Sequence, residues 1–119
     1  MYKCLLYYFD HEYTKAKECI ASFLRDVKDS KYHKNFIRAL KYMMDNKPMK
    51  AIDNFETCYQ IALKNGQYDR AIFVLKQLNE LYLDHGLQNK LKKVKELQEN
   101  FYKMSYANQI IEDIGLKLN

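Results

Sequence analysis

The chain contains very little glycine and proline for its length. Among 119 residues there are only three glycines and one proline. A β-sandwich or β-barrel needs a tight turn about every 8–12 residues, and these two residue types make most such turns. The scarcity excludes a sheet protein and indicates a few long helices. Because 48% of the residues are hydrophobic, the chain can bury a core, so a disordered chain is also excluded.

The few turn residues mark the expected ends of helices. Pro48 fits a first helical turn, and Gly66 and Gly86 can take the left-handed conformation that closes a last turn. Gly115 is expected to end the final helix. Connections of two or three residues favour antiparallel hairpins. With apolar residues at steps of three and four, the pattern predicts helices at 1–9, 12–28, 31–45, 48–65, 68–85 and 88–114.

The last of these predicted helices carries the longest apolar stripe of the chain. It extends from Leu87 to Ile114 in steps of three or four residues. Such spacing is typical of one long amphipathic helix with a single buried seam. The same seam could equally contact a partner chain.

Charge gives a weaker constraint on function. The formal net charge is +5, but charges of both signs are interspersed over most of the chain. The exception is a lysine cluster on the last predicted helix, at Lys90, Lys92, Lys93 and Lys95. A solvated helix face explains this cluster better than a nucleic-acid site, which stays an alternative.

The cysteines and the hydropathy pattern indicate a cytoplasmic protein. Cys4, Cys19 and Cys58 are odd in number and lack the pair spacing of a metal or redox motif, as expected for free thiols in a reducing compartment. The longest strictly apolar run, residues 4–9, is far too short to span a membrane. We therefore expect no metal, no cofactor and no membrane association.

An internal repeat connects the first half of the chain with the second. Ala16 and Ala51 each follow a lysine and lie 35 residues apart, with Tyr7 and Tyr42 at matched positions upstream. A helix-turn-helix unit of about 34 residues is the tetratricopeptide period. Residues 32–65 resemble one such unit, and the resemblance is carried by Ala39, Tyr42, Ala51, Phe55 and Cys58.

A second unit resembles the pattern at Leu75, Leu78, Tyr82 and Gly86, whereas Lys95 and Gln98 occupy its later signature positions. The resemblance implies a single all-α domain in which antiparallel helical hairpins stack as a short right-handed solenoid with a long C-terminal helix. Its parts would be a partial repeat at 1–30, repeats at 31–65 and 66–104, and a C-terminal extension at 105–119.

The segment from Ala62 to Ala71 is similar to the long-helix repeats of bacterial peptide-pheromone receptors of the Rap, NprR, PlcR and Rgg type. In that family a curved repeat array holds a short signalling peptide on its concave face, next to a separate DNA-binding or effector segment. The resemblance implies a role in quorum sensing and transcriptional regulation.

Candidate binding residues lie on the polar face that stacking would leave on the leading helices. Asparagine there can pair with a peptide backbone, and arginine or lysine can hold a carboxylate. A solvated face is the competing interpretation. The expected peptide- or protein-binding residues are Asn35, Arg38, Lys41, Tyr42, Lys76 and Asn79.

A second candidate surface lies at the start of the chain. The first predicted helix has more apolar surface than its own hairpin can cover. We expect Tyr2, Leu5, Leu6 and Phe9 to pack on a second copy in a homodimer or on the C-terminal helix.

Catalysis is not expected. His11, His33 and His85 are isolated, and the sequence contains no nucleophile motif and no phosphate-binding loop. The sequence therefore predicts a non-enzymatic module that binds a peptide or protein. The alternative is a structural or oligomerisation module that uses the long C-terminal helix.

Overall fold

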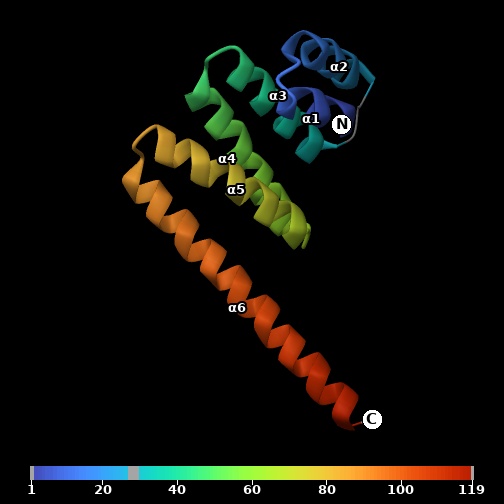
Figure 1. Cartoon of the computed structure of the whole chain (residues 1–119), viewed down its shortest axis with the longest axis vertical. Helices are drawn as coiled ribbons and strands as arrows, with labels where there is room; N and C mark the ends of the chain where they lie inside the picture. The colour runs from blue at the N-terminus through green and yellow to red at the C-terminus, as the bar shows by residue number, and fades with distance from the viewer. Residues whose placement is uncertain (1, 27–29, 119) are drawn as a thin grey trace.

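A computed structural model shows six helices joined by short connections (Figure 1). It describes the backbone of residues 2–26 and 30–118 and the side chains of residues 3–25 and 30–104. The prediction of an all-helical chain with six helices is confirmed, and no strand occurs in the described backbone. The helices are α1 (Tyr2–Phe9), α2 (Tyr13–Asp26), α3 (Lys31–Met44), α4 (Pro48–Lys64), α5 (Tyr68–Asp84) and α6 (Gln88–Leu118).

Four of the connections share one backbone geometry. Each contains a residue with left-handed φ, at His11 (60°), Asn46 (58°), Gly66 (66°) and Gly86 (66°). The N–H of the following residue donates to the carbonyl five residues earlier, at 2.8 or 2.9 Å in all four turns. This bond belongs to the Schellman motif, which satisfies the last carbonyls of a helix. The fifth residue after each left-handed position is buried, and these residues are Ala16, Ala51, Ala71 and Leu91.

The centre of the core is Phe36 of α3, which is fully buried. Its ring meets Phe55 of α4 edge-on at 5.2 Å between centroids and stacks on Phe73 of α5 at 5.6 Å. Such aromatic pairs contribute about 0.5–1.5 kcal/mol each beyond their buried area. Phe36 therefore joins three helices at one point.

The helices pack in the order of the chain, so that α4 lies against both α3 and α5, and α5 lies against both α4 and α6. The C-terminal half of α6 extends beyond the other helices (Figure 1). A ring contact of 6.1 Å between Tyr68, the first residue of α5, and Phe101 marks the place where α6 leaves α5.

The prediction that Gly115 ends the last helix is wrong, because α6 continues to Leu118. A single glycine inside a helix costs only about 1 kcal/mol relative to alanine. Gly115 also has no proline or second glycine after it. A glycine closes a helix only where the following chain turns away, as it does after Gly66 and Gly86.

The left-handed turns lead to a test of stability. Asn46→Gly should raise the free energy of unfolding by about 0.5 kcal/mol, because glycine takes left-handed φ without the strain of a Cβ. Gly66→Ala should lower it by about 1 kcal/mol for the same reason, since a Cβ at Gly66 would meet no atom within 4 Å. Chemical denaturation of the two variants measures both changes. A loss of stability in Asn46→Gly would contradict this account.

Candidate functional site

The four predicted binding residues of α3 lie on the surface of that helix. Asn35 donates its Nδ2–H to the Lys31 carbonyl one turn earlier, at 2.8 Å. Arg38 and Lys41 are exposed. Tyr42 is half-buried, with the Lys50 ammonium 5.7 Å from its ring centroid. Arg38 and Lys41 are therefore the members of this group whose charges are freely accessible to a partner.

The two predicted residues of α5 have different surroundings. Lys76 is exposed and lines a small cavity of about 120 Å³ together with Phe101 and Tyr102 of α6. The Oδ1 atom of Asn79 is buried and accepts no hydrogen bond. No hydrogen bond, ion pair or ring contact among the described side chains joins this pair to the α3 group, so the structure does not bring the six residues into one site.

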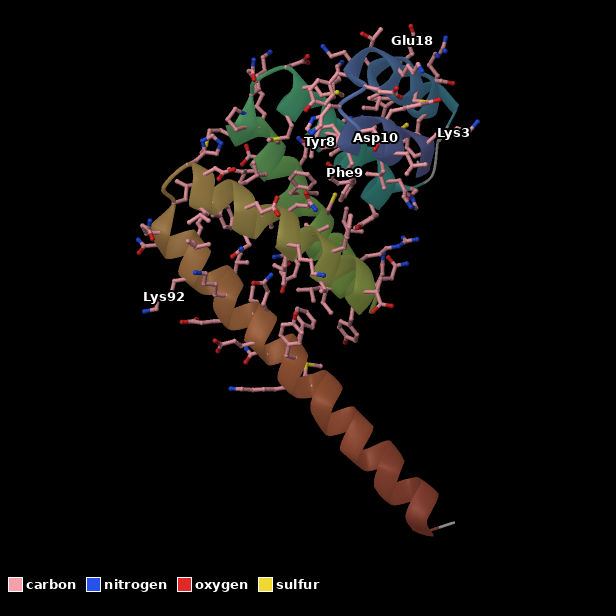
Figure 2. The ribbon with its side chains drawn as sticks, in the orientation of Figure 1. Lys3, Tyr8, Phe9, Asp10, Glu18 and Lys92 are labelled. Atoms are coloured by element: carbon pink, nitrogen blue, oxygen red, sulfur yellow. The ribbon has the colours of Figure 1, made fainter. Side chains whose placement is uncertain are left out.

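The residues predicted for self-association fall into two groups. Leu6 and Phe9 are each 49% exposed, whereas Leu5 is partly buried against the core. Phe9 also contacts the Tyr8 ring at 5.3 Å between centroids, and both are labelled in Figure 2. The side chain of Tyr2 lies outside the described residues. Leu6 and Phe9 therefore form the accessible part of this apolar surface.

The sequence did not indicate a groove of about 340 Å³ between α4, α5 and α6. Its walls combine apolar side chains with a polar rim. The rim holds Glu56 and Gln60 of α4 and Lys90 and Lys93 of α6. The apolar walls hold Leu75, Leu78, Val94 and Leu97, with Tyr59 and Tyr82 beside them.

An ion pair connects the two sides of this groove. The Lys90 Nζ lies 2.9 Å from Glu56 Oε1 and 5.8 Å from the Tyr82 ring centroid. The two charged side chains are 49% and 39% exposed, and pairs of this kind contribute no more than about 1 kcal/mol to stability. The pair is a contact between the start of α6 and α4, whose relative position is set by the packing of both helices on α5.

The tyrosines of the groove stay neutral at ordinary pH. Burial raises the pKa of Tyr82 far above its usual range, and the nearby, hydrogen-bonded Glu56 carboxylate raises it further. Burial also raises the pKa of Tyr59. The groove therefore contains uncharged phenols, and its unpaired cation among the described residues is Lys93.

The lysine cluster of α6 divides between two faces of the helix. Lys90 and Lys93 line the groove. Lys92 and Lys95 are exposed, and Figure 2 shows Lys92 pointing away from the other helices. All four lysines are exposed, as the interpretation as a solvated face expects, and Lys90 also forms the ion pair with Glu56. No signal in the sequence indicated this pair, because Glu56 lies ten residues after the turn at Asn46 and Lys90 lies four residues after the turn at Gly86, so the two are not equivalent repeat positions.

Comparison of the chain with protein-family models, with curated proteins and with solved structures found no match. Among the described residues, no cluster of three or more His, Cys, Asp or Glu side chains could hold a metal ion. Within the same part of the chain, every helix is too short or too polar to cross a bilayer.

The unpaired Oδ1 atom of Asn79 is expected to reduce the stability of the fold. Counted from the turns, Asn79 corresponds to Ala39 of α3, which is fully buried. Asn79→Ala removes an unsatisfied acceptor, so it should raise the free energy of unfolding by about 1 kcal/mol. Asn54→Ala is the matched control, since the Asn54 amide is hydrogen-bonded to the Lys50 carbonyl at 2.9 Å. Denaturation curves compare the two, and a clear loss of stability in Asn79→Ala would show that Oδ1 has a partner.

Proposed function

We propose that this chain is a non-enzymatic helical-repeat module that binds a short segment of peptide or protein in the groove between α4, α5 and α6. The observation that carries the proposal is the groove itself, which is open, apolar on its walls and polar on its rim. Peptide sites are commonly built in this way, with apolar pockets for affinity and a few polar groups for orientation. All three walls are helices, so the site needs little ordering when a ligand binds.

The side chains of the groove suggest which peptides it accepts. The partly buried Leu97 offers apolar surface to an apolar side chain of a ligand, and the core residues Leu78 and Val94 line the groove beside it. On the rim, Lys93 has no ion-pair partner among the described residues and can hold an acidic side chain. Gln60, also on the rim, can exchange hydrogen bonds with a peptide backbone. These groups favour a short ligand that combines apolar residues with at least one carboxylate.

The pattern of burial along α4 and α6 supports a tetratricopeptide-like stack. Counted from the left-handed turns, α6 places Lys92, Lys95 and Glu99 where α4 has the buried residues Ile52, Phe55 and Tyr59. Those three α6 residues are exposed, and a polar outer face is what a repeat array needs at its end. We infer a short right-handed solenoid of hairpins that ends at α6, and the unusual residues Lys95 and Gln98 of the second repeat are then part of this ending.

The resemblance to peptide-pheromone receptors gives the proposal its biological setting. A cytoplasmic, peptide-responsive regulator in a bacterium would use such a module as its sensor. A ligand that contacts both α4 and α6 would favour the arrangement in which these helices are held together. Peptide binding would thus change the position of α6 and any partner contact that α6 makes.

A peptide-binding experiment tests the proposed groove. Short peptides that mix apolar and acidic residues should bind saturably in calorimetry or fluorescence anisotropy. Lys93→Glu should weaken binding of such peptides about tenfold, because it replaces an attraction by a repulsion. Lys92→Glu makes the same charge change one residue away on the outward face, so it should leave the affinity unchanged.

Two further outcomes separate the alternatives. A loss of binding in Arg38→Ala with normal binding in Lys93→Glu would move the site to the polar face of α3. No saturable binding by any peptide, in a chain whose circular dichroism shows the folded helices, would refute the proposed function.

A further inference from the structure

A second polar cavity lies where the start of α3 meets the turn between α4 and α5. Its volume is about 330 Å³. Two cations, Lys31 and Arg70, and two amides, Asn65 and Gln67, line it, and the described lining residues include no carboxylate. This composition differs from that of the groove, which contains the Glu56 carboxylate paired with Lys90. The cavity therefore has the charge of an anion site.

The side chain of Arg70 is held in place on one side of this cavity. Its guanidinium lies 5.1 Å from the centroid of the Tyr32 ring, and its Nη1–H donates to Gln67 Oε1 at 3.3 Å. The Tyr32 hydroxyl in turn donates to the Arg70 carbonyl at 3.4 Å. Tyr32 is only 5% exposed, so this platform is part of the core. Arg70 is thus fixed before any ligand arrives.

No described carboxylate neutralises the positive charge of Arg70. Among the described residues it forms no ion pair with a carboxylate, and Gln67 is its one side-chain hydrogen-bond acceptor. A guanidinium has five N–H donors, so most of them remain available. The Gln67 amide also keeps its N–H donors, because its oxygen is the atom that accepts from Arg70.

We propose that this cavity binds a phosphate dianion, either free or as a monoester. An arginine fork matches two phosphate oxygens, and its hydrogen bonds to an ionised oxyanion are among the strongest in proteins. Lys31 supplies the second positive charge, and the amides of Asn65 and Gln67 supply neutral donors to the remaining oxygens. Two cations and two amides suit a tetrahedral dianion better than a planar carboxylate of single charge. The proposal does not depend on the peptide groove, because the two cavities share no lining residue.

A natural reporter lies next to the cavity. The Ser30 hydroxyl, which lines the cavity, contacts His33 Nδ1. Burial lowers the pKa of His33, and the charge of Arg70 lowers it further. A bound dianion offsets the Arg70 charge, so the ring signals of His33 should shift when the cavity is occupied.

Titration with inorganic phosphate tests the proposal. In NMR spectra recorded at constant pH and ionic strength, phosphate should shift the His33 ring signals and the amide signals of residues 65–70 saturably. Arg70→Met should weaken phosphate binding at least tenfold. Arg38→Met is the matched control, because Arg38 is exposed on α3 and lines neither cavity, and it should bind phosphate as the unchanged chain does.

Additional ligands identify the source of the phosphate, and a conservative variant separates loss of binding from misfolding. O-phosphoserine and a phosphoserine peptide should bind more tightly than inorganic phosphate if the natural ligand is an ester on a protein, and equally or less tightly if it is free phosphate. Arg70→Lys keeps the charge but loses the fork, so it should retain the fold and bind several-fold more weakly. Sodium chloride at matched ionic strength should produce no local shifts. Equal phosphate affinity in Arg70→Met, Arg38→Met and the unchanged chain would overturn the proposal.

Discussion

The left-handed turn that closes α1, α3, α4 and α5 is the constraint on which the arrangement of the helices depends. Each turn reverses the chain with the same hydrogen bond between the residue after the left-handed position and the carbonyl five residues before it. Because this geometry repeats, the next helix always begins at the same distance from the turn and buries its fourth residue at the crossing. Three of those four residues are alanines, which let the helix axes approach closely. The groove and the anion cavity both lie between helices that these turns position.

Much of this fold could be predicted because the chain marks two of the turns with glycine and a third with proline. Gly66 and Gly86 have the left-handed φ expected of them, and Pro48 begins α4. The turn at His11 has the same geometry without a glycine, so only the break in the apolar pattern indicated it. The error at Gly115 has the opposite cause, because glycine permits a left-handed turn but does not require one. Local sequence thus predicted where helices can end, and packing decided where they do end.

The candidate site was much less predictable, for a physical reason. The sequence pattern predicts which face of a helix is polar, but the groove depends on the separation of α4 and α6, which do not follow each other in the chain. Glu56 and Lys90 meet because both helices pack on α5 at the same register. The central position of Phe36 in the core was likewise not predicted from the sequence pattern. The polar face of this helix drew attention to Asn35 and Arg38, whereas the core aromatic ring follows directly after Asn35 in the chain, at the face that α4 and α5 share.

Helix α5 connects the two candidate sites, because it contributes lining residues to both cavities. Arg70, near its first turn, lines the anion cavity, and Tyr82, near its last turn, lines the groove. Between them lies Asn79, whose buried oxygen has no hydrogen-bond partner, at a place where α3 has alanine. An unpaired buried acceptor costs about 1–3 kcal/mol, so packing alone favours the smaller residue there. Natural chains keep such costs mainly where a polar group has a role. Helix α5 buries its apolar stripe of Val74, Leu75 and Leu78 almost completely, so it is held rigidly in the core. A ligand in either cavity therefore acts on the same helix that positions α6.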